Sequence, residues 1–287
     1  MKAAVVGPLC RDSNVIGGKC YQATGGVTYY AGTALARLGA ETVVFASCGE
    51  NSPVWPEEKR LRVVKIPAAG TLEFINEYDS ADQRRQRTVV CDNRISPDQI
   101  DEHDLAGVDF IIAGPLLAGD LSLPLVKYLA RFGRLALAAQ GLIRYAGREG
   151  IEWKKAEKVL KFLPWFEYVA LDEAELRFIG GRDDLDLAAR TLQDAGAANL
   201  IVTRGGAGSV LFLGGERYRI PAFPPLRLAD PTGAGDTYLA GYLRALELFD
   251  DPAERGNFAA MAATLSLESH GPFAGSLEEL RRRLGRL

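Results

Sequence analysis

Short apolar runs alternate with longer segments of helical periodicity along most of the chain. The apolar, β-branched runs predict buried strands at residues 3–6, 41–46, 109–113, 134–138, 168–171 and 200–203. Apolar residues spaced three and four apart predict helices at residues 29–38, 121–132, 153–162, 174–179 and 185–195. Such alternation is typical of a mostly parallel sheet covered by helices on both faces, so we expect a three-layer α/β/α sandwich.

One stretch departs from this alternation. Three extended segments follow one another at residues 61–66, 71–78 and 84–91, and they predict a small separate sheet. The turn at residues 79–83 predicts a hairpin that projects from the main body, and such projections often act as lids over active sites. Three arginines of this hairpin form either a solvated face or a positive surface for a phosphate or a partner subunit: Arg84, Arg85 and Arg87.

Composition and charge limit the classes of function. The chain has 287 residues, 47% hydrophobic and 25% charged, which suits a globular protein of one or two domains. Lys and Arg number 34 against 37 Asp and Glu, so there is no basic excess to neutralise a nucleic acid backbone. The longest apolar runs, such as residues 108–117, are far shorter than the roughly 20 residues that cross a bilayer. We expect a cytoplasmic protein without nucleic acid or membrane partners.

The cysteines and histidines do not form a recognisable metal motif. They lie far apart without a Cys-x-x-Cys pair, at Cys10, Cys20, Cys48, Cys91, His103 and His270. We interpret the cysteines as reduced thiols of an intracellular protein that pack as small apolar residues.

The clearest chemical signal is a small-residue turn that leads into a predicted helix: Asp230-Pro231-Thr232-Gly233-Ala234-Gly235-Asp236-Thr237. Its glycines leave backbone N–H groups uncovered at the helix start, where the positive end of the helix dipole binds anions. Asp236 stands beside this anion hole, where a carboxylate weakens anion binding but can serve as a general base. An Asp in a first helical turn can also be a simple cap. The combination favours phosphoryl transfer, in which positioning and electrostatics supply most of the catalysis.

This segment resembles the C-terminal signature of the ribokinase-like, or PfkB, family of sugar and nucleoside kinases. Other segments resemble family motifs in the family's order. Residues 6–12 resemble the first strand with its substrate-binding Asp, and residues 25–26 and 34–40 resemble the glycine signature. Residues 172–175 resemble the Asn-x-x-Glu motif, residues 202–209 resemble the nucleotide-binding strand and turn, and residues 258–275 resemble the final helix and adenine-side loop. The resemblance implies one ribokinase-like domain over residues 1–287, with a mostly parallel central sheet and a lid formed from about residues 10–24 and 61–94.

The resemblance also implies roles for individual residues. The implied base is Asp236, and the implied anion hole is Gly233, Ala234 and Gly235. The implied substrate-binding residues are Asp12, Gly25, Gly26, Tyr30 and Arg144. The implied nucleotide-binding residues are Asp172, Thr203, Gly205, Gly208 and Ala260. Glu175 would organise Mg²⁺ through water, and a monovalent cation such as K⁺ would be held around Asp230, Thr232, Ser266, Ser269, Gly271 and Gly275.

Departures from the family pattern narrow the substrate. Tyr30 stands where ribokinases have Asn, and Asp172 replaces the Asn of the Asn-x-x-Glu motif, so ribose is a poor fit. The inositol kinase branch is resembled instead by the arginine hairpin together with residues 71–74, 91–92, 142–144 and 230–231. We therefore expect an ATP-dependent kinase that transfers the γ-phosphoryl group to a hydroxyl of a sugar or an inositol-like polyol. A homodimer through the lid, in which Leu72, Phe74 and Tyr78 face a partner, is a further expectation.

Other enzyme classes fit the sequence less well. No Gly-x-x-x-x-Gly-Lys-[Ser/Thr] loop occurs, which excludes the P-loop kinases. Because Lys161 is the last lysine, backbone N–H groups, magnesium and arginines such as Arg204 must offset the charge of the phosphoryl donor. Gly7-Pro8 follows the first strand in place of a dinucleotide-binding Gly-x-Gly-x-x-Gly, and no Gly-x-Ser-x-Gly hydrolase motif is present. A nucleoside kinase on the same fold stays open, as does a silent sugar or nucleotide sensor, against which the intact Asp236 and Glu175 argue.

Overall fold

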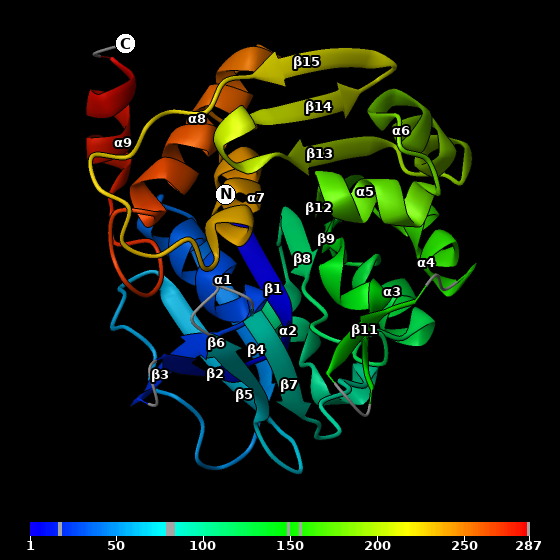
Figure 1. The fold of residues 1–287 in the computed structure, drawn as a ribbon, viewed down its shortest axis with the longest axis vertical. Helices are drawn as coiled ribbons and strands as arrows, with labels where there is room; N and C mark the ends of the chain where they lie inside the picture. The colour runs from blue at the N-terminus through cyan, green and yellow to red at the C-terminus, as the bar shows by residue number, and fades with distance from the viewer. Residues whose placement is uncertain (17–18, 79–83, 148–149, 155–156, 286–287) are drawn as a thin grey trace.

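The computed structural model describes residues 1–16, 19–78, 84–147, 150–154 and 157–285 (Figure 1). Within these residues, nine strands form the large sheet in the order β15-β14-β13-β12-β9-β8-β1-β4-β5. Pairing is parallel from β13 to β5, whereas β14 runs antiparallel to both of its neighbours. The strands are β1 (Lys2–Pro8), β4 (Glu41–Cys48), β5 (Leu61–Pro67), β8 (Phe110–Ala113), β9 (Arg134–Ala138), β12 (Tyr168–Asp172), β13 (Asn199–Thr203), β14 (Ser209–Leu213) and β15 (Glu216–Ile220).

Helices cover both faces of this sheet, which confirms the predicted α/β/α layering (Figure 1). One face carries α1 (Val27–Arg37), α7 (Ala234–Ala245), α8 (Pro252–Ser266) and α9 (Leu277–Leu284). The other carries α2 (Glu102–Leu105), α3 (Leu123–Leu129), α4 (Glu157–Phe162), α5 (Glu173–Gly180) and α6 (Leu185–Asp194). Short 3₁₀ turns are η1 (Pro97–Gln99), η2 (Ala139–Ile143), η3 (Leu163–Trp165) and η4 (Gly205–Ala207).

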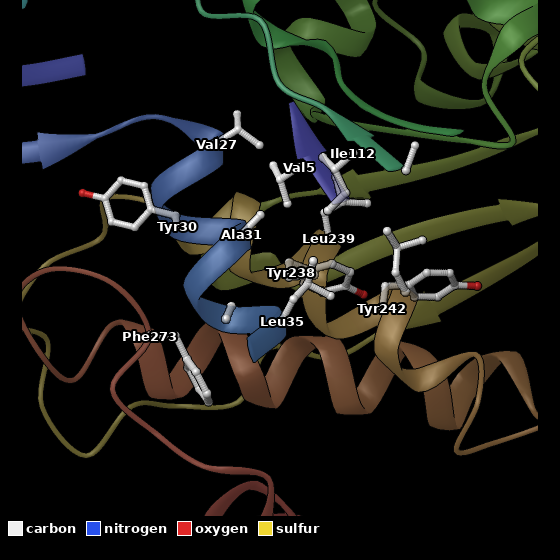
Figure 2. Close-up of a cluster of buried hydrophobic side chains, with 14 of the residues drawn as sticks. Val5, Val27, Tyr30, Ala31, Leu35, Ile112, Tyr238, Leu239, Tyr242 and Phe273 are labelled. Atoms are coloured by element: carbon white, nitrogen blue, oxygen red, sulfur yellow. The ribbon is translucent and has the colours of Figure 1, made fainter. Parts of the chain in front are cut away.

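Two separate hydrophobic cores follow from the alternation of side chains along each strand. In β1, Ala3 and Val5 join the core under α1, α7 and α8, while Ala4 and Val6 join the core on the opposite face. Figure 2 shows Val5 beside side chains of α1 and α7 in the first of these cores. Burial on both faces explains why the inner strands read as continuous apolar runs in the sequence.

A second, smaller sheet forms the lid, in the order β3-β2-β6-β7. Its strands are β2 (Cys10–Ile16), β3 (Lys19–Gly25), β6 (Leu72–Tyr78) and β7 (Arg84–Val89), and a hairpin of β10 (Arg144–Ala146) and β11 (Ile151–Trp153) forms a third sheet. The predicted turn at residues 79–83 and the side chains of Tyr78, Arg84 and Arg85 lie outside what the structure describes.

Three sequence predictions about elements are wrong. Residues 61–66 belong to β5, which pairs in parallel with β4 at the edge of the large sheet and not with the lid. An edge strand with one solvated face has the same apolar pattern as a lid strand, so only the pairing partner distinguishes them. The predicted helix at 153–162 is β11 followed by the shorter α4, and α8 is followed by α9, so residues 258–275 do not hold the last helix.

The predicted dimer surface of the lid is also wrong in part. Leu72 and Phe74 are buried in the core of their own chain, with exposed fractions of 0% and 3%, and therefore cannot face a partner subunit. Their strand β6 lies beside β2, which rests on the carboxyl end of β1. The apolar side chains of Leu72 and Phe74 thus pack the lid against the main body of the protein.

The sheet order indicates where a binding site is expected, at the carboxyl end of β1. This strand lies between β4 and β8, so the chain winds in opposite directions on its two sides. Ligands of open α/β sheets bind at such a switch point. In the described part of the chain, no helix is long and apolar enough to span a membrane.

Candidate active site

The predicted anion-hole turn forms the start of α7. Gly233 caps the helix with a φ of 76°, in the left-handed region that side chains rarely adopt. A Cβ atom at this position would lie 2.2 Å from ring atoms of Tyr30, so the close contact also requires glycine. Gly235 has no atom within 4 Å of its Cβ position, which leaves open space at the helix start. The N–H of Ala234 donates to the carbonyl of Pro231 at 3.3 Å, so the uncovered N–H groups of the predicted anion hole are those of Gly233 and Gly235.

Asp236 lies in the first turn of α7, immediately after these N–H groups, and its side chain is only partly exposed. Burial raises the pKa of its carboxyl to about 7, and the negative charge of Glu175 adds to this shift. A carboxyl with a pKa near neutrality can accept a proton at physiological pH and still transfer it readily. Asp236 is therefore the candidate general base.

Glu175 lies across the site in the first turn of α5, where it forms a capping box with Asp172. The backbone N–H of Asp172 donates to Glu175 Oε2 (2.9 Å), and the N–H of Glu175 donates to Asp172 Oδ1 (2.7 Å). Gln140 Nε2 donates to the other oxygen, Glu175 Oε1, at 2.7 Å. Burial raises the pKa of Glu175 to about 7, with a further contribution from the charge of Asp172, against the opposing effect of these hydrogen bonds.

These carboxylates fit a magnesium ion that is held mainly by donor phosphates. Glu175 is 3% exposed and raises the pKa of Asp236, so a nearby cation would relieve the repulsion between them. Among the described residues, no three His, Cys, Asp or Glu side chains come together as a metal site. Mg²⁺ commonly binds through one or two carboxylates, water and substrate phosphates, which matches this donor set.

The lid contributes the predicted acceptor side. Asp12 lies on β2, and a Cβ atom at Gly25 on β3 would lie 2.2 Å from Asp12 Oδ2, so the glycine makes room for the carboxylate. Gly26 follows with a φ of 107° and caps α1. The guanidinium of Arg144 lies over the ring of Phe74, 4.6 Å from its centroid.

The electrostatics of a buried thiol place the lid strand β2 near the start of α7. Burial raises the pKa of Cys10, and the charges of Asp12, Asp236 and Asp120 raise it further, whereas Arg144 lowers it. One buried sulfur is therefore within electrostatic reach of the predicted substrate residues and the candidate base.

Tyr30 packs against the glycine turn at the start of α7. Its hydroxyl donates to the carbonyl of Thr24 (3.1 Å), and its ring lies against Gly233. The side chain projects from α1, and only 3% of the residue is exposed (Figure 2). The contact with Gly233 joins α1 to α7. A contact between Tyr30 and substrate stays a prediction.

The predicted nucleotide side is formed by the loop after β13. Thr203 pairs with Asp172 in the register of β13 and β12, so both lie at the same sheet edge. Gly208 has a φ of 83°, and a Cβ atom there would lie 2.1 Å from the carbonyl oxygen of Ile220. Arg204 Nε donates to Glu173 Oε2 at 2.8 Å, so the arginine expected to offset donor charge is already held by a carboxylate.

Ala260 lies farther along this side. It is buried on α8, and its carbonyl accepts a hydrogen bond from Thr264 Oγ1 (2.9 Å). The same hydroxyl also reaches the carbonyl of Phe223 at 3.1 Å, which fixes the loop after β15 on α8. Ala260 therefore lies near this loop, while its contact with a nucleotide stays a prediction.

The residues predicted to hold a monovalent cation come together around the end of α8. The N–H groups of Ala229 and Asp230 point to the carbonyl of Leu267 (2.8 and 3.3 Å), and Asp230 Oδ1 accepts from the N–H of Thr232 (2.9 Å). Ser269 Oγ is buried without a hydrogen-bond partner in the described structure, which fits an oxygen ligand for a cation. The remaining predicted positions lie in or after α8. The hydroxyl of Ser266 donates a hydrogen bond to the carbonyl of Ala263. Gly271 has a φ of 83°, and Gly275 lies against the ring of Phe273.

Three polar residues near the site are absent from the sequence-based candidates: Cys10, Asp120 and Gln140. Gln140 follows the predicted strand 134–138 directly, and ligand-binding residues gather at the carboxyl ends of parallel strands, so its position was a usable signal. Asp120 accepts hydrogen bonds from the N–H groups of Leu116 and Leu117 (2.9 and 2.7 Å), a loop contact that the local sequence does not indicate.

Together, the layered sheet, the lid and the glycine turn followed by Asp236 define a ribokinase-like kinase. The chain belongs to the pfkB family of carbohydrate kinases, whose family model matches residues 96–279. It is therefore a phosphotransferase with an alcohol group as acceptor, and the predicted family and fold are confirmed.

Individual relatives differ in how much of the chain they match. Inositol 3-kinase of Oryza sativa is 26% identical over 286 residues, which cover 92% of this chain and 68% of that protein. A nucleoside kinase of Methanocaldococcus jannaschii is 39% identical over 72 residues, which cover only 25% of this chain and 24% of that kinase. A solved pyrophosphate-dependent kinase of the ribokinase family, in complex with a pyrophosphate analogue and myo-inositol, has a TM-score of 0.79 and 24% identity over 98% of this chain and 99% of its own.

Proposed function

We propose that the protein transfers the γ-phosphoryl group of ATP to a hydroxyl of a polyol similar to myo-inositol. The proposal rests on Asp236, a carboxyl with a pKa of about 7 placed directly after the uncovered N–H groups of a helix start. This arrangement puts a proton acceptor and an anion-binding site next to each other, as phosphoryl transfer to an alcohol requires.

In the proposed reaction, Asp236 accepts the hydroxyl proton as the acceptor oxygen forms a bond to the γ-phosphorus. The bond between that phosphorus and the bridging oxygen breaks, and ADP carries away its electron pair. The N–H groups of Gly233 and Gly235, and that of Ala234 shared with the carbonyl of Pro231 (3.3 Å), stabilise charge on the transferred phosphoryl oxygens. When bound beside Glu175, Mg²⁺ would neutralise charge on the donor phosphates.

The polyol substrate is supported by the acceptor side of the site. Asp12 on β2 offers a carboxylate and Arg144 on β10 a guanidinium fork, and both neighbour Phe74 of β6, so vicinal hydroxyls bound there can hydrogen-bond to such groups. Arg144 is 9% exposed, so a hydroxyl bonded to it replaces little water. The inositol 3-kinase of Oryza sativa, matched over 92% of this chain, supports the same class of acceptor.

For the donor, the loop before the anion hole favours ATP over pyrophosphate. Leu226 and Leu228 on this loop are 82% and 70% exposed, and they offer apolar surface near Asp230 that a nucleoside can cover. Pyrophosphate has no apolar part that would use it. The likeness to a pyrophosphate-dependent kinase makes pyrophosphate the donor to test against ATP.

The experiment supplies each donor with a panel of inositols, hexoses, ribose and nucleosides, in the presence of Mg²⁺ and K⁺. We expect phosphorylated myo-inositol or a close polyol, detected by ³¹P NMR, together with one ADP per product. Asp236→Asn serves as the control and should lose the reaction. A protein that binds ATP but phosphorylates none of the panel would contradict the proposal and favour a sensor.

A nucleoside kinase is the second candidate, because the 72-residue match to the Methanocaldococcus jannaschii enzyme has 39% identity. Turnover of a nucleoside at least tenfold more efficient than that of every polyol would select this candidate. The same panel therefore decides between the two.

A further inference from the structure

Gln140 connects two buried charged groups that lie on different sides of the site. Its Nε2 donates to Glu175 Oε1 at 2.7 Å, and its Oε1 accepts from Arg144 Nη1 at 3.2 Å. Glu175 and Arg144 are 3% and 9% exposed, whereas Gln140 itself is exposed. A single amide thus lies between a buried carboxylate and a buried guanidinium.

A primary amide of this length suits both contacts at once. A guanidinium donates only and a carboxylate accepts only, so the bridging side chain must offer an acceptor at one end and a donor at the other. A glutamate at position 140 would satisfy Arg144 but repel Glu175, and a methionine would satisfy neither. Buried charged groups that lose a hydrogen-bond partner are costly, so both ends of the bridge are sensitive to its removal.

The backbone that carries Gln140 is held firmly. The residue lies in η2, directly after β9, and Gly141 follows it. A Cβ atom at Gly141 would lie 2.0 Å from the carbonyl oxygen of Pro115, so the turn packs tightly against the loop after β8. Ala139 on the other side is 1% exposed. The amide therefore starts from a fixed point between the two charges.

Each partner of Gln140 is anchored on a different element. Arg144 stacks on Phe74 of the lid strand β6, with 4.6 Å from the guanidinium carbon to the ring centroid. Glu175 receives the N–H of Asp172 at the start of α5 (2.9 Å). A continuous chain of contacts runs from the lid, through Gln140, to the helix start that faces the donor side.

We propose that Gln140 is a positioning residue that fixes the position of Arg144 on the acceptor side relative to Glu175 on the donor side. This inference rests on the proposed kinase function and deepens it. If the bridge acts on both sides, its loss alters acceptor binding and turnover together, whereas loss of a residue on one side alters mainly one of them.

The test compares wild type with Gln140→Met, which keeps the length of the side chain and removes both hydrogen bonds. Gln193→Met is the matched control, because Gln193 lies in the last turn of α6, an element to which no site residue is assigned. We expect Gln140→Met to raise the acceptor KM and lower kcat, each by about tenfold, because each end loses a hydrogen bond to a charged group. Gln140→Glu should lower kcat further, because the new carboxylate faces Glu175.

A second readout does not depend on turnover. Calorimetry with myo-inositol alone, in EDTA and without donor, should show several-fold weaker binding to Gln140→Met than to wild type, with no change in Gln193→Met. Should Gln140→Met fail to fold, Gln140→Asn replaces it, since its amide is one methylene too short to reach both partners.

The outcomes separate the two levels of inference. A wild type that phosphorylates no member of the panel contradicts the proposed function itself. A wild type that phosphorylates a polyol while Gln140→Met changes only one of the two kinetic constants, or neither, overturns the role of Gln140.

Discussion

The donor side and the acceptor side of the candidate site consist of different kinds of chemical groups. On the proposed donor side, the candidate binding groups are backbone N–H groups and small residues, and residues 230–237 and 203–208 are each contiguous in the sequence. On the acceptor side, Asp12, Phe74 and Arg144 are side chains from three separate elements that meet only in the fold. The type of reaction is thus encoded locally, while the choice of acceptor depends on long-range pairing.

The largest expected effect comes from the donor side. Asp236→Asn should lower kcat by about 100-fold or more, as is typical when a general base is lost, with little change in the acceptor KM. Because burial and Glu175 raise the pKa of Asp236 to about 7, the ionised carboxylate destabilises the folded protein above that pH. The variant should therefore be more stable than wild type at pH 8, by about 1–3 kcal/mol in denaturant unfolding.

The sign of this stability difference follows from proton binding. The folded protein holds the Asp236 proton more tightly than the unfolded chain, so the wild type loses stability as pH rises from about 4 to 7. The advantage of Asp236→Asn should shrink toward zero at pH 4. An equal advantage at both pH values would contradict the raised pKa.

The pH dependence of turnover comes next. A base with a pKa of about 7 is active only when ionised, so kcat/KM should fall about tenfold per unit below pH 7. Initial rates between pH 5 and 9 with a stable donor measure this limb. A flat profile down to pH 5 would remove Asp236 from the role of base.

Gly233→Ala tests whether the turn itself matters. The left-handed φ of 76° and the ring of Tyr30 2.2 Å from the new Cβ atom should cost about 1–3 kcal/mol of stability and at least tenfold in kcat. Gly235→Ala is the matched control, because its Cβ meets open space. Thermal unfolding of the two variants should differ clearly; equal stability would show that the contact with Tyr30 is loose.

Arg144→Lys sharpens the comparison from the acceptor side. Lysine keeps the charge but loses the planar fork and the stacking on Phe74, so the acceptor KM should rise on the order of tenfold while kcat changes much less. Steady-state kinetics at saturating donor separate the two constants. A variant that loses kcat alone would place Arg144 on the donor side.

The smallest expected effect concerns the cation loop. Replacing K⁺ by Na⁺ at equal ionic strength should lower kcat a few-fold, and Ser269→Ala, which removes a buried unpaired hydroxyl, should weaken this dependence. Gly271→Ala is unsuitable for the same purpose, because its φ of 83° adds strain. Equal rates in both salts would leave the loop a purely structural role.

Much of this molecule could be predicted from its sequence, because its signals are local. The buried strands read as apolar runs, and the turn at residues 230–237 carries its chemistry in one segment. The misplaced β5 shows the limit, since an edge strand and a lid strand share one pattern and differ only in their partner. The hairpin of β14 and β15 around Gly214 and Gly215 is missing from the predicted strands, because antiparallel pairs interrupt the alternation.

Site contacts show the same division. Gly233 could be predicted from its motif, but the ring of Tyr30 beneath it comes from a helix about 200 residues away, and no local pattern indicates that meeting. For Gln140, the only signal in the sequence was its position directly after a predicted strand. Its bridge depends on side chains from η2, β10 and α5, which only the tertiary structure aligns.

The absence of lysine after Lys161 has a practical consequence. The elements from β12 to α9, which include the predicted donor-side residues, carry no amine for a coupling reagent, while residues 1–161 carry all the lysines and the N-terminus. Amine chemistry on a sensor chip or resin would therefore tether the protein through the residues before β12 and leave the elements from β12 to α9 without a covalent attachment. Immobilised in this way, the enzyme should keep its affinity for the phosphoryl donor.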